Sequence, residues 1–135
     1  MALGEELRKL LRPEQVDDSA DTLEKNSRDA SLFVLRPEVV VQPQDADDMK
    51  QLVRFVADKK KQDPHRRISL TARAAGTDMS GGPLTDSIVV DMTAHLNRLL
   101  EVGSKAATVQ PGMYFRDFDK ETKKRSEKHI TAIRI

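Results

Sequence analysis

The feature that most constrains the fold is a clearly delimited helix between two runs of β-forming residues. Residues 39–41 read VVV between Pro37 and Pro43, which predicts a short strand buried on both faces. QDADDMKQLVRFVADKKKQD then predicts a helix, because Asp45 can cap its start, acidic residues occupy its first turn and lysines its end. Apolar residues at helical spacing give this helix a buried stripe: Met49, Leu52, Val53 and Val56.

Two more β-rich runs follow this helix. Pro64 ends the helix, RRISLTARA begins a second strand and SIVVDM forms a third. A strand–helix–strand–loop–strand order is typical of α/β units with parallel strands. Two short strands that turn at Gly103 and Ser104 come next, and MYFRDFDKETKKRSEKH predicts a helix anchored by Phe115 and Phe118.

The first 33 residues follow a different pattern. Leu3, Leu7, Leu10 and Leu11 recur at helical spacing, and a polar stretch with few apolar anchors follows them. This pattern predicts a surface helix followed by a mobile loop. We therefore expect residues 1–33 to form a helical appendage rather than a domain.

Composition excludes several classes of function. The 135 residues suit one domain, and 23 basic against 22 acidic residues create no overall field that favours nucleic acid or acidic lipid. The absence of cysteine excludes disulfides, zinc–thiolate sites and a thiol nucleophile. No segment has the apolar core of a signal peptide or approaches the roughly 20 apolar residues of a membrane span. We expect a soluble cytoplasmic protein.

The remaining polar residues give no strong signal for a metal site or for nucleic acid. The histidines at 65, 95 and 129 share no ligand spacing, so we predict no metal site. The basic runs at 59–61, 65–67 and 123–128 lie at helix ends or in the tail, and no aromatic residues alternate with them. Solvated faces explain these runs, so we predict no nucleic-acid binding. Asp91 is expected to have a structural role, either in a hydrogen bond to the loop backbone or as a cap of the segment that follows the third strand.

A glycine-rich loop joins the second and third predicted strands. The stretch TARAAGTDMSGGPLTDSIVVDM holds Gly76, Gly81 and Gly82, half of the six glycines in the chain. Pro83 stands where a Walker loop needs lysine, and the strand that follows the loop excludes a dinucleotide fingerprint, which would open a helix. Asp78, two residues before Ser80, stands where a nucleophile elbow needs glycine.

Two interpretations of the loop remain. Successive backbone N–H groups can form an anion-binding concavity, to which Thr77 and Ser80 would add hydroxyl groups and Arg73 a cation. Alternatively, the loop is an irregular turn in which glycine supplies positive φ angles.

Three segments in order resemble a known family: RPEVVVQPQDADDMKQLVRFV, the glycine-rich stretch, and LNRLLEVGSKAATVQPG. They resemble the N-terminal FAD-binding domain of the vanillyl-alcohol oxidase and p-cresol methylhydroxylase family. The branch with D-lactate dehydrogenases and the glycolate oxidase FAD subunit is the most similar. The resemblance implies an α/β fold, α+β overall, in which a short parallel sheet flanked by helices precedes the start of a second, antiparallel subdomain. It covers 34–124, a partial FAD-binding domain, and leaves 125–135 as a polar tail that departs from the family.

The resemblance also implies roles for single residues. The loop 73–82 would wrap the FAD pyrophosphate, Pro43 would lie beside the adenosine, and Pro111 and Gly112 would line the cofactor. Branches that link the flavin covalently have histidine before the loop aspartate; Thr77 stands there, so non-covalent FAD is implied. The implied cofactor-binding residues are Pro43, Arg73, Ala74, Ala75, Gly76, Thr77, Asp78, Ser80, Gly81, Gly82, Pro111 and Gly112.

The implied function is that of a flavin-linked oxidoreductase that acts on a 2-hydroxy acid of the D-lactate or glycolate type. We predict no catalytic residue, because the resemblance places the substrate-side groups beyond Ile135. We therefore expect a truncated product, a fragment or a partner-dependent subunit that is inactive alone. The alternative is a non-catalytic α/β fragment or interaction module without flavin. An exposed apolar patch around the third strand would support either an interface or a truncation.

Overall fold

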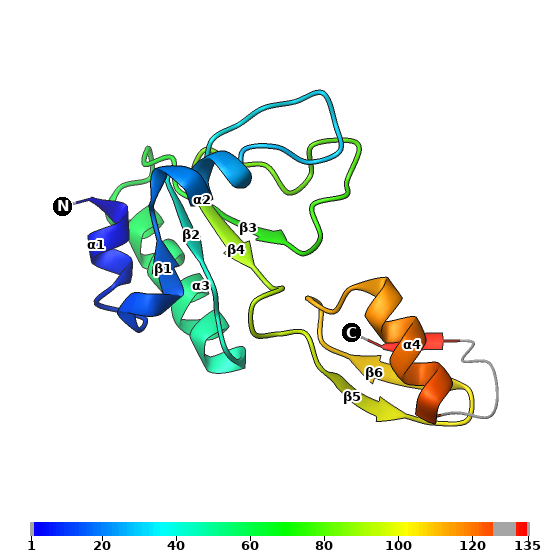
Figure 1. Ribbon diagram of the computed structural model, residues 1–135. Helices are drawn as coiled ribbons and strands as arrows, with labels where there is room; N and C mark the ends of the chain where they lie inside the picture. The colour runs from blue at the N-terminus through cyan, green and yellow to red at the C-terminus, as the bar shows by residue number, and fades with distance from the viewer. Residues whose placement is uncertain (1, 126–131, 135) are drawn as a thin grey trace.

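The β-forming runs build two separate sheets (Figure 1). The computed structural model describes residues 2–125 and 132–134. The first lobe (residues 2–92) holds a sheet of order β1–β2–β4–β3 with strands Val16–Asp17, Val39–Val41, Ile88–Asp91 and Leu70–Arg73. The second lobe (residues 99–125 and 132–134) holds a sheet of order β5–β6–β7 with strands Leu99–Val102, Ala106–Val109 and Ala132–Arg134. The helices are α1 Leu3–Leu7, α2 Ala20–Lys25, α3 Ala46–Gln62, α4 Phe115–Arg125 and a 3-10 turn, Pro13–Gln15.

The first lobe has the predicted parallel sheet. Strands β2 and β3 both run parallel to the central strand β4, with Val39 and Leu70 each opposite Ile88. Residues 39–41 and 88–90 are at most 1% exposed, as expected for strands covered on both faces. The third predicted strand, β4, therefore shows no exposed apolar patch in the described structure: the exposed large apolar side chains of this lobe include those of residues 32–35 and Met79.

Helix α3 begins and ends near the predicted residues. One carboxylate oxygen of Asp45 accepts hydrogen bonds from the N–H groups of Asp47 and Asp48, both at 2.9 Å. Leu52 is buried as expected, but Val53 is 55% exposed, because the buried face is rotated towards Leu52 and the partly buried Phe55. No helix within the described residues is long and apolar enough to cross a membrane.

The N-terminal segment is built into the first lobe. Leu3, Leu7 and Leu11 are buried in the same apolar cluster as the outer valines of β2 and the residues of α3. Strand β1 pairs antiparallel with β2 (Val16 opposite Val41) and so extends the sheet. The prediction of a surface helix at the start of the chain is therefore wrong, because the leucines at helical spacing are buried against the core. The division of the chain at residues 33 and 124 stays a prediction.

The second lobe is a hairpin covered by α4. Strands β5 and β6 pair antiparallel and turn at the predicted position, while β7 runs parallel to β6. Phe118 is buried with Ala107 and Val109. Phe115, also predicted as an anchor, is 71% exposed, and its ring is tilted by 37° against that of Phe118, with 6.2 Å between ring centroids. Most of the predicted polar tail, 126–131 and 135, lies outside the described residues.

A close backbone approach joins the two lobes. Leu96 donates its N–H to the carbonyl of Met92 at 3.1 Å, and Gly112 donates its N–H to the carbonyl of Leu96 at 2.7 Å. A Cβ atom on Gly112 would overlap the Met92 carbonyl and would lie 2.8 Å from the Leu96 carbonyl oxygen. Only glycine fits at this position, so Gly112 allows the second lobe to contact the chain that leaves β4.

Candidate functional site

A polar cleft of about 190 Å³ lies at the carboxyl ends of the parallel strands. Gln42 directly follows β2, Asp91 ends β4 and Arg73 ends β3. Ligands of open α/β sheets bind at this edge of the sheet. We call it the carboxyl-end cleft; its lining residues are Thr22, Lys25, Asn26, Val40, Gln42, Arg73, Ala74, Ala75, Asp91, Thr93 and Tyr114.

The first half of the glycine-rich loop offers free backbone donors. Gly76 has φ +67° and Gly81 has φ +83°, and no other type of residue in the described ranges has a positive φ. The N–H groups of residues 74–77 donate to no acceptor among the described residues. Consecutive free N–H groups beside a left-handed glycine are an arrangement that binds anions.

The second half of the loop is held by Asp78. Its carboxylate accepts hydrogen bonds from the N–H and the hydroxyl of Ser80, at 2.5 and 2.6 Å. The hydroxyl of Ser80 is the main cause that lowers the pKa of Asp78, so this carboxylate stays ionised at neutral pH. The hydrogen bonds between Asp78 and Ser80 thus fix the conformation of the turn that leads to Gly82.

Arg73 is a cation fixed at the edge of the cleft. Its guanidinium donates to the carbonyl of Arg28 at 2.7 Å and to the carbonyl of Asn26 at 3.4 Å. The guanidinium also lies against Gly76, where a Cβ atom would approach its central carbon to 2.7 Å. Because its partners are neutral carbonyls, the positive charge of Arg73 is not compensated by a bound carboxylate.

The structure brings together only part of the predicted site. Arg73, Ala74 and Ala75 line the carboxyl-end cleft, and the loop from 76 to 82 continues away from it beside residues 30–33 (Figure 1). There Ala30 donates its N–H to the carbonyl of Asp78 at 3.1 Å, and the ring of Phe33 lies against Gly81.

The predicted residues outside the loop lie elsewhere. Pro43 is buried beyond Gln42, and Gly112 is at the junction between the lobes. Pro111 lines a separate, mostly apolar groove of about 340 Å³ between the start of α3 and the second lobe. The cofactor contacts implied for these three residues stay predictions.

Sequence reasoning missed several residues of the cleft. Gln42 could have been found, because it directly follows a predicted parallel strand, and Asp91, which ends β4, was given only a structural role. The carboxylate of Asp91 accepts hydrogen bonds from the N–H and hydroxyl of Thr93 at 2.8 and 2.7 Å, so it caps the following turn as expected. Tyr114 and the residues from α2 had no local signal, because only the tertiary fold brings them to the sheet edge.

Residues 37–128, more than half of the chain, match the family described as FAD binding domain. The chain belongs to this FAD-binding domain family. Its fold is similar to that of part of alkyldihydroxyacetonephosphate synthase, solved in two crystal forms. The TM-scores are 0.72 and 0.73 at 20% and 18% identity, and the match covers 90% of this chain and 24–25% of the synthase. The predicted family and α/β fold are therefore confirmed.

Two curated relatives are similar in sequence to this FAD-binding domain. It is 36% identical over 74 residues to D-2-hydroxyglutarate dehydrogenase of Pseudomonas putida, a match that covers 55% of this chain and 7% of the relative. It is 32% identical over 84 residues to the Escherichia coli enzyme of the same name, and this match covers 62% of this chain and 8% of the relative. The chain thus spans less than a tenth of the length of these relatives.

The residues of the carboxyl-end cleft fit the FAD that the family implies. A pyrophosphate is anionic. The cleft offers the cations Lys25 and Arg73, and the row of free N–H groups at residues 74–77 begins in its lining with Ala74 and Ala75. Asp91 is the one carboxylate in the lining, and Thr93 already donates to it. In a flavoprotein the cofactor supplies the redox chemistry, while the protein supplies binding, orientation and electrostatics.

Proposed function

We propose that this chain forms part of a flavoprotein and holds FAD non-covalently, with the pyrophosphate against the loop 73–82. The observation that carries this proposal is the row of free N–H groups at 74–77, next to the uncompensated cation of Arg73 at the carboxyl end of a parallel sheet. Thr77 precedes Asp78 in place of a histidine, which supports non-covalent attachment.

We further propose that the complete flavoprotein oxidises a 2-hydroxy acid in the cytoplasm. The names of the relatives from Pseudomonas putida and Escherichia coli support a D-2-hydroxyglutarate type of substrate, in the same chemical class as D-lactate and glycolate. FAD in such an enzyme supplies the acceptor for the hydride lost from the carbon that bears the hydroxyl. No residue of this chain is assigned a catalytic role.

Isothermal titration calorimetry of the full chain with FAD and with ADP tests the proposal. Because the free N–H groups and Arg73 face the pyrophosphate, we expect both ligands to bind with similar, weak affinity. Binding of neither ligand would show the proposal to be wrong. After acid precipitation, bound flavin should appear in the supernatant; flavin that stays in the pellet would contradict non-covalent attachment.

A second candidate function is that of an interaction module without flavin. Leu32 and Met79 are highly exposed, and Phe33 lies against Gly81, so apolar side chains gather where the two loops meet. Exposed apolar patches mark protein–protein contacts in soluble proteins. Self-association on a sizing column without flavin would favour this candidate, and a monomer that carries flavin would oppose it.

A further inference from the structure

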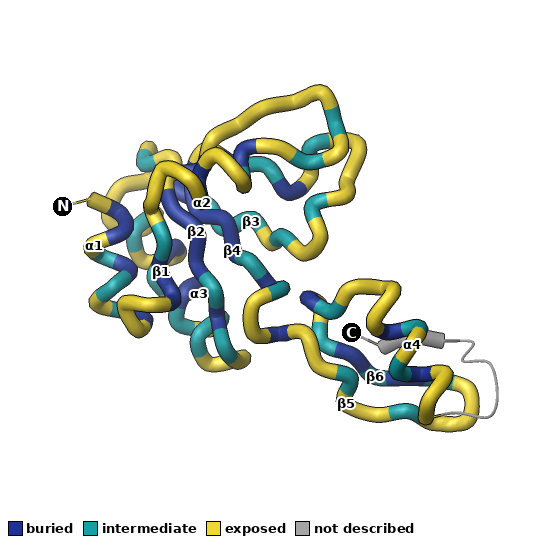
Figure 2. The backbone as a smooth tube through the Cα atoms, in the orientation of Figure 1, coloured by how far each residue is buried: buried dark blue, intermediate teal, exposed yellow. Residues whose placement is uncertain are grey.

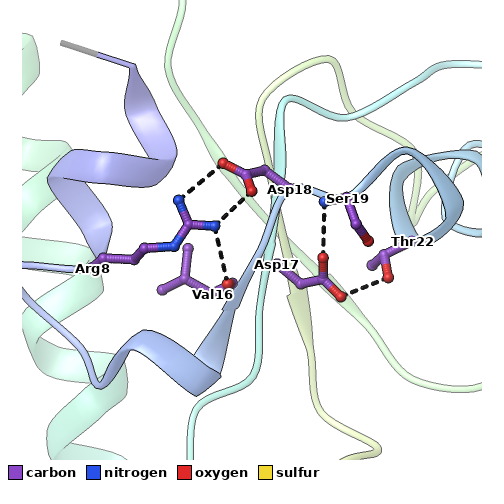
Figure 3. Close-up of polar contacts among 6 residues, drawn as sticks. All are labelled: Arg8, Val16, Asp17, Asp18, Ser19 and Thr22. Atoms are coloured by element: carbon purple, nitrogen blue, oxygen red, sulfur yellow. Dashed lines mark hydrogen bonds and ion pairs between the residues drawn. The ribbon is translucent and has the colours of Figure 1, made fainter.

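Helix α2 lies outside the residues matched by the FAD-binding family, yet it forms one wall of the carboxyl-end cleft. The start of α2 is fixed to β1 (Figure 3). The carboxylate of Asp17 accepts hydrogen bonds from the N–H of Ser19 at 2.9 Å and from the hydroxyl of Thr22 at 2.6 Å. The guanidinium of Arg8 donates to the carboxylate of Asp18 at 2.5 and 3.1 Å, which ties the same turn to α1.

The body and the end of α2 are fixed as well. Leu23 is buried against Val40 and Val89, so the helix covers one face of the parallel sheet. After the helix, the amide of Asn26 donates to the carbonyl of Thr22 at 2.9 Å. These contacts at both ends hold the last turn of α2 beside the cleft.

That last turn presents an unpaired cation. Lys25 is exposed and lines the cleft, and its ammonium group makes no hydrogen bond or ion pair with any residue that the structure describes. The second cation, Arg73, is held by the carbonyls of Asn26 and Arg28, so the same segment supplies one charge and positions the other. Two cations against the single carboxylate of Asp91 leave one net positive charge in the cleft.

We propose that Lys25 is a phosphate ligand of the bound FAD and that the turn at residues 26–28 positions Arg73 for the same pyrophosphate. This inference rests on the proposed FAD site, since it names residues that would bind the anionic part of that ligand. A purely structural role for Lys25 would be to complement the dipole at the end of α2. Lys60, exposed in the last turn of α3 and absent from the lining of the cleft, can fill that role without a ligand, and it provides a matched control.

The test compares the full chain with three variants, Lys25→Met, Lys25→Arg and Lys60→Met. Affinity for FAD, ADP and adenosine is measured by calorimetry at several salt concentrations, and thermal unfolding checks that each variant is folded. Lys25→Met should weaken FAD and ADP about tenfold, the loss expected for one charge-assisted hydrogen bond. Lys25→Arg should restore most of this affinity, and Lys60→Met should leave it unchanged.

Adenosine separates a phosphate contact from a general effect, because it carries no phosphate. Its affinity should not change in Lys25→Met, and the salt dependence of ADP binding should become shallower in that variant. Unchanged ADP binding in a folded Lys25→Met variant, or an equal loss for adenosine or in Lys60→Met, would overturn the role of Lys25 while the FAD site stands. Absence of FAD and ADP binding to the unmodified chain would overturn the proposed function, and this inference with it.

Discussion

The two lobes bury their sheets to different degrees (Figure 2). In the first lobe, alternate residues of β2 and β4 face two apolar clusters: one formed with α1 and α3, the other with Leu23 of α2. In the second lobe, β6 alternates between buried and less buried residues, and α4 supplies one buried aromatic side chain, Phe118. A sheet covered on both faces can be stable by itself, whereas a hairpin with one covered face relies on few contacts.

This difference predicts that the first lobe determines the stability of the whole chain. The second lobe should unfold separately while the first lobe stays folded. The two lobes are joined by the backbone contacts around Gly112, and the apolar cluster of the second lobe contains no residue of the first.

Ile88→Ala should have the largest effect. Ile88 is fully buried in the central strand of the first lobe, and removal of such a side chain costs about 4 kcal/mol of unfolding free energy. Urea denaturation should show this loss, and hydrogen exchange should increase in both lobes. Val53→Ala, at an exposed position of α3, is the control and should change little. Unchanged protection from hydrogen exchange in the second lobe of Ile88→Ala would contradict the dependence of that lobe on the first.

Phe118→Ala should unfold only the second lobe. Its ring is the main buried contact of α4 with the hairpin, and its removal should cost about 3 kcal/mol locally. Hydrogen exchange resolved by segment should rise in β5, β6 and α4 and stay slow in β2 and β4. Phe115→Ala changes the same residue type on the exposed part of α4 and should have little effect. Loss of protection in β4 would show that the lobes unfold together.

Gly112→Ala should separate the lobes without removing either core. The added methyl group would overlap the carbonyl of Met92, and relief of this overlap should cost about 2 kcal/mol. We expect a change in the small-angle scattering profile, while the circular dichroism of the lobes is retained. Gly103→Ala, in the hairpin turn, is the control, because its nearest contact is 3.3 Å from the new methyl group. An unchanged scattering profile would argue against a junction that depends on glycine.

Glu6→Gln should have the smallest effect, on the acid stability of the first lobe. The ammonium of Lys59, 2.6 Å from the carboxylate, lowers the pKa of Glu6 in the folded state. A lowered folded pKa contributes stability above the unfolded value near 4.3, and this stability is lost as the pH falls through the folded pKa.

The substitution should therefore remove about 1 kcal/mol at pH 7 and flatten the decrease in stability below pH 5. Urea denaturation across this pH range measures both effects. Glu121→Gln removes a more exposed helical pair with Lys124 in the second lobe, and it should leave the unfolding of the first lobe unchanged. An unaltered acid profile in Glu6→Gln would show that the ion pair contributes nothing.

The parts of the fold that were predictable have local signals. The VVV strand, the Asp45 cap and the turn after Val102 each depend on neighbouring residues, and each was placed correctly. The burial of Leu3 and Leu7 and the exposure of Phe115 depend on which element packs against which face. One amphipathic stripe cannot specify its partner, so these features required the tertiary structure.

The candidate site likewise contains residues with a signal in the sequence and residues without one. Arg73 was predicted as a cation at the edge of the glycine-rich loop, Ala74 and Ala75 were implied by the family resemblance, and all three line the cleft. Lys25 lies in a polar helix that has no motif, and Tyr114 comes from the other lobe. Their approach to the cleft results from the pairing of β1 with β2 and from the junction at Gly112, which no local pattern encodes.

The hydrogen bonds of Arg73 also set an order for folding. They connect Arg73 to residues 26 and 28, which are 47 and 45 positions away along the chain. Contacts this distant require a long loop to close, as does the pairing of β2 with β4, so we expect them to form together with the sheet rather than with local helices. During synthesis the ribosome releases α2 well before β3. Helix α2, the N-terminal wall of the cleft, is therefore present before Arg73 can bind to the residues that follow it. The cleft therefore becomes competent for ligands only after the parallel sheet is assembled.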